Sequence, residues 1–212
     1  MAKPDITKTN DAIDRLMAVT TNVRHRFMLT AFYRHRFLEI AGRYPEIFAP
    51  DMMVERPVYH FRALGINVRL DGADAVKGLY DMWAQTHQSI FLVEREQIAV
   101  ADNFIATVAW GYQQVLGEAL IANSIGVDDP KAYYKYGFSG SGIQQFWPYD
   151  DRGRLVGEDV WEPDPEQAVI TKLDPADVMT TQEAAVLLSP MIKPLPLFDE
   201  MVLGRRSVAA YS

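Results

Sequence analysis

The chain has 212 residues, of which 49% are apolar and 23% are charged, so one globular domain with a sizeable core is expected. The formal charge is −7 and no basic stripe is present, which argues against nucleic acid or a membrane surface as a partner. No apolar run reaches the roughly 18 residues of a membrane span. Because cysteine and a signal-peptide pattern are also missing, we expect a cytoplasmic protein.

The first 90 residues predict helices around one strand. Apolar residues recur at helical spacing through 11–43, and Gly42 and Pro45 mark the end of this helix. Residues 52–61 alternate in the manner of a strand, in which Pro57 indicates an edge or a bulge. A second amphipathic helix begins after Asp71, whose side chain can cap it.

A succession of strands is predicted in the middle of the chain. The runs at 91–101, 104–117 and 118–127 have strand character, and so do 141–150 and 155–164, which are joined by a D-R-G-R turn. The heptapeptide AYYKYGF at 132–138 is expected to form a loop between two long strands.

The last fifty residues differ from the rest. They carry six of the twelve prolines and one short predicted helix, TTQEAAVLL, with Thr180 or Thr181 as its cap. We therefore divide the chain into a domain at 1–162 and a C-terminal extension at 163–212 that packs on the domain or on a neighbouring subunit. The element order predicts an α+β fold in which N-terminal helices lean on a curved antiparallel sheet with one open mouth.

Known cofactor and metal motifs are missing from the sequence. The four histidines are scattered without a ligand spacing, and there is no Walker loop or dinucleotide turn. The glycine-rich GFSGSG at 137–142 opens a strand and not a helix, which argues against phosphate binding. We expect no metal and no cofactor.

Three residues are the candidates for chemistry. Strand alternation places Tyr59 and His60 on opposite faces of their strand, and either is an acid or base if it faces the pocket. Lys135 stands among tyrosines, where it is able to hold a developing oxyanion or share a proton with a phenol. The competing interpretations are a half-buried structural tyrosine, a hydrogen-bonded structural histidine and a surface lysine.

Further polar and aromatic residues are candidates for binding the substrate. Glu158 and Asp159 are adjacent on the last strand, so at most one of them faces the pocket. The competing interpretation is that these carboxylates are charges that face solvent. The remaining candidates are aromatic residues of the pocket wall or of the core: Trp110, Tyr112, Tyr134, Tyr136 and Phe146.

A family resemblance is carried by DGADAVKGLYDMW, by the long paired strands and by FWPYDDRGRLVGEDVWEPD. Over roughly residues 10–162 the chain resembles the SnoaL-like branch of the NTF2-like superfamily, which implies a cone-shaped fold. With Tyr59 in VYHF and Lys135 in YYKYGF, the chain resembles the bacterial γ-formaldehyde lyases of lignin catabolism.

This resemblance implies a cofactor-independent lyase that cleaves a lignin-derived diarylpropane diol and releases formaldehyde and a stilbene. It leaves open a polyketide cyclase or dehydratase, and a small-molecule binding protein without chemistry, because the fold hosts all three. Related proteins with C-terminal arms imply a homo-oligomer, a trimer before a dimer. The expected partner is a small aromatic substrate.

Overall fold

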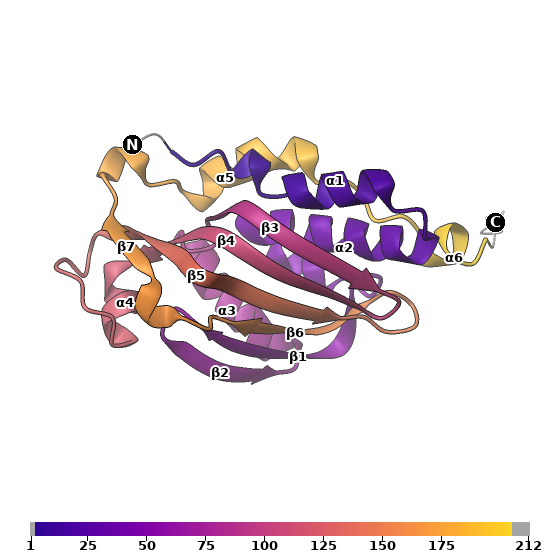
Figure 1. Ribbon diagram of the computed structural model, residues 1–212, viewed down its shortest axis with the longest axis horizontal. Coiled ribbons are helices and arrows are strands. Elements are labelled where there is room, and N and C mark those ends of the chain that lie inside the picture. Colours follow the sequence, from indigo (N-terminus) through magenta and orange to yellow (C-terminus); the bar gives the residue numbers. More distant parts are fainter. Residues whose placement is uncertain (1–2, 205–212) are drawn as a thin grey trace.

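One mixed sheet and the helices that cover it make up the computed structural model, which describes residues 3–204 (Figure 1). The strands are paired in the order β2-β1-β6-β5-β4-β3, and β7 pairs with the first part of β5. Their bounds are β1 Met53–Ala63, β2 Ile66–Asp71, β3 Phe91–Ala101, β4 Phe104–Leu116, β5 Tyr133–Pro148, β6 Leu155–Trp161 and β7 Val169–Lys172. The expected α+β class is confirmed. An all-antiparallel sheet is wrong, because β1 and β6 run parallel.

Two helices replace the single helix that was expected at 11–43. They are α1 Asp11–Val19 and α2 Val23–Ile40, and the side chain of Asn22 starts the second by accepting hydrogen bonds from the amides of Arg24 and His25. The other α-helices are α3 Ala73–Gln85, α4 Gly117–Ala122, α5 Thr181–Leu188 and α6 Phe198–Met201. Short 3-10 turns lie between several of these elements.

Three local expectations were wrong. Residues 117–122 form α4 and not a strand, in keeping with the good helix formers of Glu118–Ala122. Strand β2 was not foreseen. The heptapeptide at 132–138 is not a loop, because Tyr133 begins β5 and the following residues pair with both β4 and β7.

From Phe27 onward, helix α2 is buried on every side. His35, Arg36, Phe37 and Leu38 are consecutive and all buried, although at about 100° per residue they point in four directions. The sheet lies against one side of α2, where the Phe32 ring packs on a β5 tryptophan, and α1, α5 and α6 lie against the other (Figure 1). Polar side chains on this helix therefore have little access to water.

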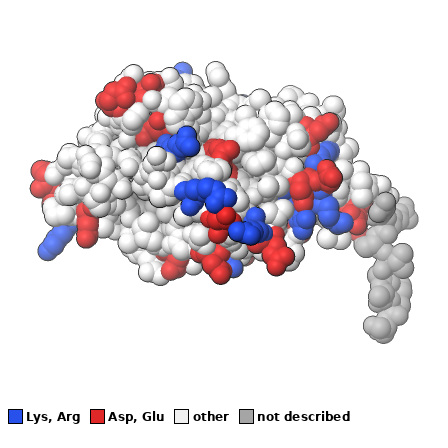
Figure 2. Space-filling view, turned by 90° about the horizontal axis from the view of Figure 1, so that it is seen from below, with Lys and Arg blue, Asp and Glu red and all other residues white. Residues whose placement is uncertain are grey.

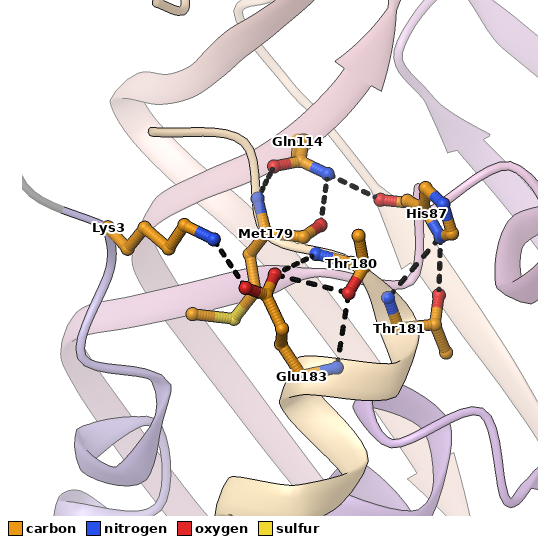
Figure 3. Close-up of polar contacts among 7 residues, drawn as sticks. All are labelled: Lys3, His87, Gln114, Met179, Thr180, Thr181 and Glu183. Carbon is orange, nitrogen blue, oxygen red and sulfur yellow. Dashed lines mark hydrogen bonds and ion pairs between the residues drawn. The ribbon is translucent and has the colours of Figure 1, made fainter. Parts of the chain in front are cut away.

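In the described residues, the C-terminal extension packs on the domain of its own chain. Figure 3 shows how the segment just before α5 is held: the Gln114 side chain on β4 forms hydrogen bonds with both the amide and the carbonyl of Met179, and also with the carbonyl of His87. Helix α5 then begins with the expected cap at Thr180, which forms a capping box with Glu183. Further along, Phe198 of α6 packs edge-on against Phe27 of α2.

The described residues contain no helix that is long and apolar enough to cross a membrane. On the face drawn in Figure 2, acidic and basic side chains lie beside each other, and no broad area of one sign is visible.

The parallel contact between β1 and β6 depends on the absence of a side chain at Gly157. A Cβ atom built there would lie 1.9 Å from the Val58 carbonyl oxygen on β1. We expect Gly157→Ala to lower the free energy of unfolding by about 1–3 kcal/mol or more, because backbone atoms must move. The matched control is Gly78→Ala in α3, where a Cβ meets nothing within 4 Å and is expected to stabilise by up to about 1 kcal/mol. Urea denaturation checks both, and equal stabilities would contradict this role of Gly157.

Candidate functional site

An aromatic cavity lies between the sheet and helices α2 and α3. The empty space in and around it, which includes open solvent at its mouth, is about 760 Å³. Its walls are mostly apolar, but polar side chains gather at one end. The principal wall residues are Phe61, Leu79, Trp83, Phe91, Leu92, Trp110, Tyr112, Phe138, Ile143, Trp147 and Val160, and the polar lining residues are Arg36, Glu39, Tyr59, Tyr80, Gln113, Gln145 and Glu158.

The pairing of the strands brings Tyr59 and Glu158 together. They are direct partners in the parallel pair β1–β6, so their side chains leave the sheet on the same face. Tyr59 is 3% exposed and Glu158 is 6% exposed. Tyr59 is therefore not an edge tyrosine that reaches water, because β2 covers the outer side of β1.

Helices α2 and α3 complete this polar end. His35 and Glu39 are four residues apart on α2, which places both on one face of the helix, with their side chains 4.0 Å apart. The His35 Nε2 atom lies 3.0 Å from the hydroxyl oxygen of Tyr80 on α3, and Tyr80 donates a hydrogen bond of 3.4 Å to the hydroxyl of Tyr59.

The hydroxyls of Tyr59 and Tyr80 form a chain with the imidazole of His35. Each hydroxyl is able to donate one hydrogen bond and to accept others, and His35 donates or accepts at Nε2 according to its tautomer. Tyr59 is a lining residue of the cavity, which makes its hydroxyl a candidate contact for a ligand oxygen.

Both carboxyl groups at this end are held in the neutral form. Burial raises the pKa of Glu39 to about 8, although Arg36 opposes the shift. Burial, with Glu39 as the next cause, raises the pKa of Glu158 well above its usual value. Burial likewise raises the pKa of the Tyr59 and Tyr80 hydroxyls.

The two charged groups nearby neutralise each other. Arg36 forms a two-pronged ion pair with Glu96 on β3, with N–O distances of 2.6 and 3.0 Å, and the Glu96 side chain is fully buried. His35 carries no charge to add, because burial lowers its pKa to about 3. The polar end is therefore rich in protons but has no net charge near neutral pH.

Of the three candidate catalytic residues, the structure brings only Tyr59 to the cavity. His60, on the other face of β1, lies 2.5 Å from Asp159, and both side chains are largely exposed. Lys135 is not among the lining residues. Its ammonium group lies 4.0 Å from the centre of the Tyr112 ring and 4.0 Å from Glu94, in a neighbouring surface depression that shares Trp110, Gly111 and Phe138 with the cavity.

The expected binding residues are divided in the same way. Glu158, Trp110 and Tyr112 line the cavity. Tyr134 and Tyr136 are buried outside its lining, where their hydroxyls donate to Asp128 and Glu162, respectively. Phe146 is 39% exposed and stacks on Phe104 at another surface depression.

Sequence reasoning missed the contribution of α2 and α3 to the site. His35, Arg36, Glu39 and Tyr80 were not among the candidates for chemistry. A usable signal was present in RFLE at 36–39, where two charged residues flank two large apolar ones within a predicted helix. Buried charges of this kind are paired or neutralised, and often functional.

Proton transfer is the chemistry for which this arrangement is suited. The described residues contain no group of three His, Cys, Asp or Glu side chains that is able to hold a metal ion. What they do contain is two neutral carboxylic acids and two phenols in a water-poor space, all able to donate protons to a bound oxygen.

Comparisons with known proteins give structural similarity alone. No protein-family model matches the sequence, and a search of curated proteins found no match. An NTF2-like protein from Anabaena variabilis is similar with 6% identity, a TM-score of 0.47 and coverage of 75% of this chain and 96% of the other. The epoxide hydrolase/cyclase-like enzyme SalBIII, from salinomycin pyran ring formation, is similar with 9% identity, a TM-score of 0.41 and coverage of 63% and 86%.

A phenazine biosynthesis-related protein from Pseudomonas aeruginosa has 13% identity and a TM-score of 0.40, with coverage of 71% of this chain and 83% of the other. At such identities and TM-scores the activity has to be inferred from the residues of this chain.

The buried groups predict how stability depends on pH. Between pH 4.5 and about 8 the folded protein keeps the Glu39 proton that the unfolded chain releases, so the free energy of unfolding falls as pH rises. His35 acts oppositely between about 3 and 6.5, where only the unfolded chain gains a proton. We expect stability to rise up to pH 4.5, to fall from there to 6.5 because Glu39 and Glu158 together outweigh His35, and to fall more steeply up to about 8.

Urea denaturation across this pH range measures the effect, which for one group is at most about 1.4 kcal/mol per pH unit. Glu39→Gln is expected to reduce the fall above pH 6.5, and Glu55→Gln on β1 is the control, since it makes the same change at an exposed position. An unchanged fall in Glu39→Gln would contradict a neutral Glu39.

Proposed function

We propose that this protein is a cofactor-independent lyase that cleaves a carbon–carbon bond in a lignin-derived diarylpropane diol, releasing formaldehyde and forming a stilbene. The observation that carries the proposal is the polar end of the cavity, where Tyr59 and Glu158 are buried, Glu39 is mostly buried, and burial raises the pKa of all three groups. The resemblance to the γ-formaldehyde lyases supplies the substrate class.

The walls of the cavity support an aromatic substrate. Aromatic side chains on both the sheet and α3, including Phe61, Trp83 and Phe138, form the apolar part, which favours burial of aryl rings. The polar end has hydrogen-bond donors but no net charge, so it suits hydroxyl groups better than carboxylates. A neutral diol with two aryl rings has both kinds of group.

The buried acids support an enzyme over a carrier. Leaving ionisable groups in a cavity costs free energy, which an apolar binding protein has no reason to spend. Groups with strongly shifted pKa values in a cleft are typical of active sites. Here Glu39 and Glu158 have shifts of the same origin and lie on separate elements, α2 and β6, that both face the cavity.

The proposed reaction balances without a cofactor. A base takes the proton of the terminal hydroxyl, the bond to the terminal carbon breaks, and that carbon leaves as formaldehyde. The freed electron pair forms the stilbene double bond, and the benzylic hydroxyl departs as water with a proton from an acid. Neutral Glu158 is the proposed acid, and Glu39, with a pKa of about 8, is the proposed base once it is ionised.

Tyr59 has a supporting role in this scheme. Tyr59 directs its O–H to a substrate oxygen, which stabilises charge that develops there. After turnover Glu39 holds a proton and Glu158 lacks one, and in this scheme exchange with water through the open cavity resets both groups.

Lys135 has no part in the proposed reaction, since it lies outside the cavity. We retain a homo-oligomer, a trimer before a dimer, and a cytoplasmic location as proposals. Exposed aromatic groups at the depression on the outer side of the sheet support assembly: Phe146 is 39% and Trp161 is 52% exposed.

The direct test is incubation of the purified protein with a 1,2-diarylpropane-1,3-diol that carries a para-hydroxyl group. We expect formaldehyde and stilbene in equal amounts, with or without EDTA. Loss of turnover on EDTA dialysis, restored by one divalent ion, would overturn the cofactor-free mechanism. A cyclised or dehydrated product that retains the terminal carbon would favour the cyclase or dehydratase, and tight binding without any product would favour a binding protein.

Substitutions distinguish the assignments of the catalytic residues. Glu158→Gln and Tyr59→Phe are each expected to lower turnover about 100-fold or more, since each removes one proton donor while keeping the bulk of the side chain. Lys135→Met and His60→Gln carry the alternative assignments and are expected to stay within a few-fold of the parent. If Lys135→Met is the damaging change, the reaction does not take place at the polar end of this cavity.

A further inference from the structure

One donor in the cavity wall has no acceptor. Trp147 lies on β5, is 2% exposed and lines the cavity, yet its indole Nε1 atom is buried without a hydrogen-bond partner among the described residues. A buried donor without a partner costs about 1–3 kcal/mol, and native proteins contain few of them. The mechanism described above makes no use of this group.

The neighbours of Trp147 explain why no side chain satisfies it. The faces of its ring system are in edge-to-face contact with Phe32 and with His35, both at 4.8 Å between ring centroids. His35 Nε2 is engaged with Tyr80. The side chain is thus held by aromatic packing at the polar end of the cavity, beside lining residues such as Gln145 and Glu158.

A second tryptophan provides the contrast. Trp110 also lines the cavity, but its Nε1 atom donates to the carbonyl of Gly140 at 3.0 Å. The protein therefore satisfies the indole N–H of Trp110 on β4 and leaves the indole N–H of Trp147 on β5 without an acceptor.

We propose that the Trp147 indole N–H donates a hydrogen bond to an uncharged oxygen atom of the ligand in this cavity and so positions the ligand. The inference rests on the proposed function only in that the cavity binds a small oxygen-bearing aromatic compound. An indole N–H is a neutral donor without acceptor capacity, so it selects a hydroxyl, ether or carbonyl oxygen. Trp147 is a binding residue in this scheme and does not transfer a proton.

The test compares ligands that differ only in oxygen. Binding of trans-stilbene and of its 2-, 3- and 4-hydroxy derivatives is measured by fluorescence titration with the parent protein and with Trp147→Phe. We expect Trp147→Phe to weaken at least one hydroxystilbene about 3- to 10-fold more than stilbene itself, which is the scale of one neutral hydrogen bond. Trp110→Phe makes the same change at a satisfied indole and is expected to weaken all of these ligands alike.

A spectroscopic readout separates this role from packing. The chain has four tryptophans, and the indole resonance that disappears in Trp147→Phe identifies the Trp147 N–H in a ¹⁵N spectrum. We expect that resonance to move downfield on addition of the favoured hydroxystilbene, and not with stilbene. An equal loss for all ligands, no movement of the resonance, or no binding of any stilbene would overturn the proposal. Because none of these readouts needs turnover, they can fail or succeed independently of the lyase reaction.

Discussion

The ion pair between Arg36 and Glu96 is the interaction on which the rest of the site depends. Helix α2 is covered on all sides, so its polar residues face a medium that penalises charge. Arg36 keeps its charge because Glu96 on β3 meets it at 2.6 Å, and this pair ties the helix to the sheet. His35 and Glu39 on the same helix have no such partner and are kept neutral.

The sheet positions the other half of the site through the register of one pair of strands. The parallel pairing of β1 with β6 sets Tyr59 opposite Glu158 on the cavity face and His60 opposite Asp159 on the outer face. The same two strands therefore present a buried, protonated pair and an exposed, charged pair. A shift of β6 by one residue would move Asp159 to the cavity face and Glu158 to the outer face. The close approach of the two backbones at Gly157 helps to hold that register.

The sequence was sufficient for the elements with strong local patterns. Strand-like runs located β3 and β4, the D-R-G-R turn joined β5 to β6, and the threonine cap marked the start of α5. Alternation narrowed the site to Tyr59 or His60 and to Glu158 or Asp159, and it could not decide which member of each pair faces the cavity. The contribution of α2 to the site was not predictable from local patterns, because the burial of Arg36 and Glu39 depends on segments distant in the sequence that pack on this helix. The same holds for Lys135, which was given to a loop although its segment pairs on both sides within β5.

The central claim is that the polar end of the cavity holds protonated carboxyl groups at neutral pH. Difference infrared spectroscopy of the parent protein against Glu158→Gln tests it most directly, because a protonated carboxyl and a carboxylate absorb at separate positions. The account predicts that at pH 7 the parent shows the C=O stretch of a protonated carboxylic acid that Glu158→Gln lacks. If the substitution instead removes only carboxylate bands at pH 7, Glu158 is ionised and the account is contradicted.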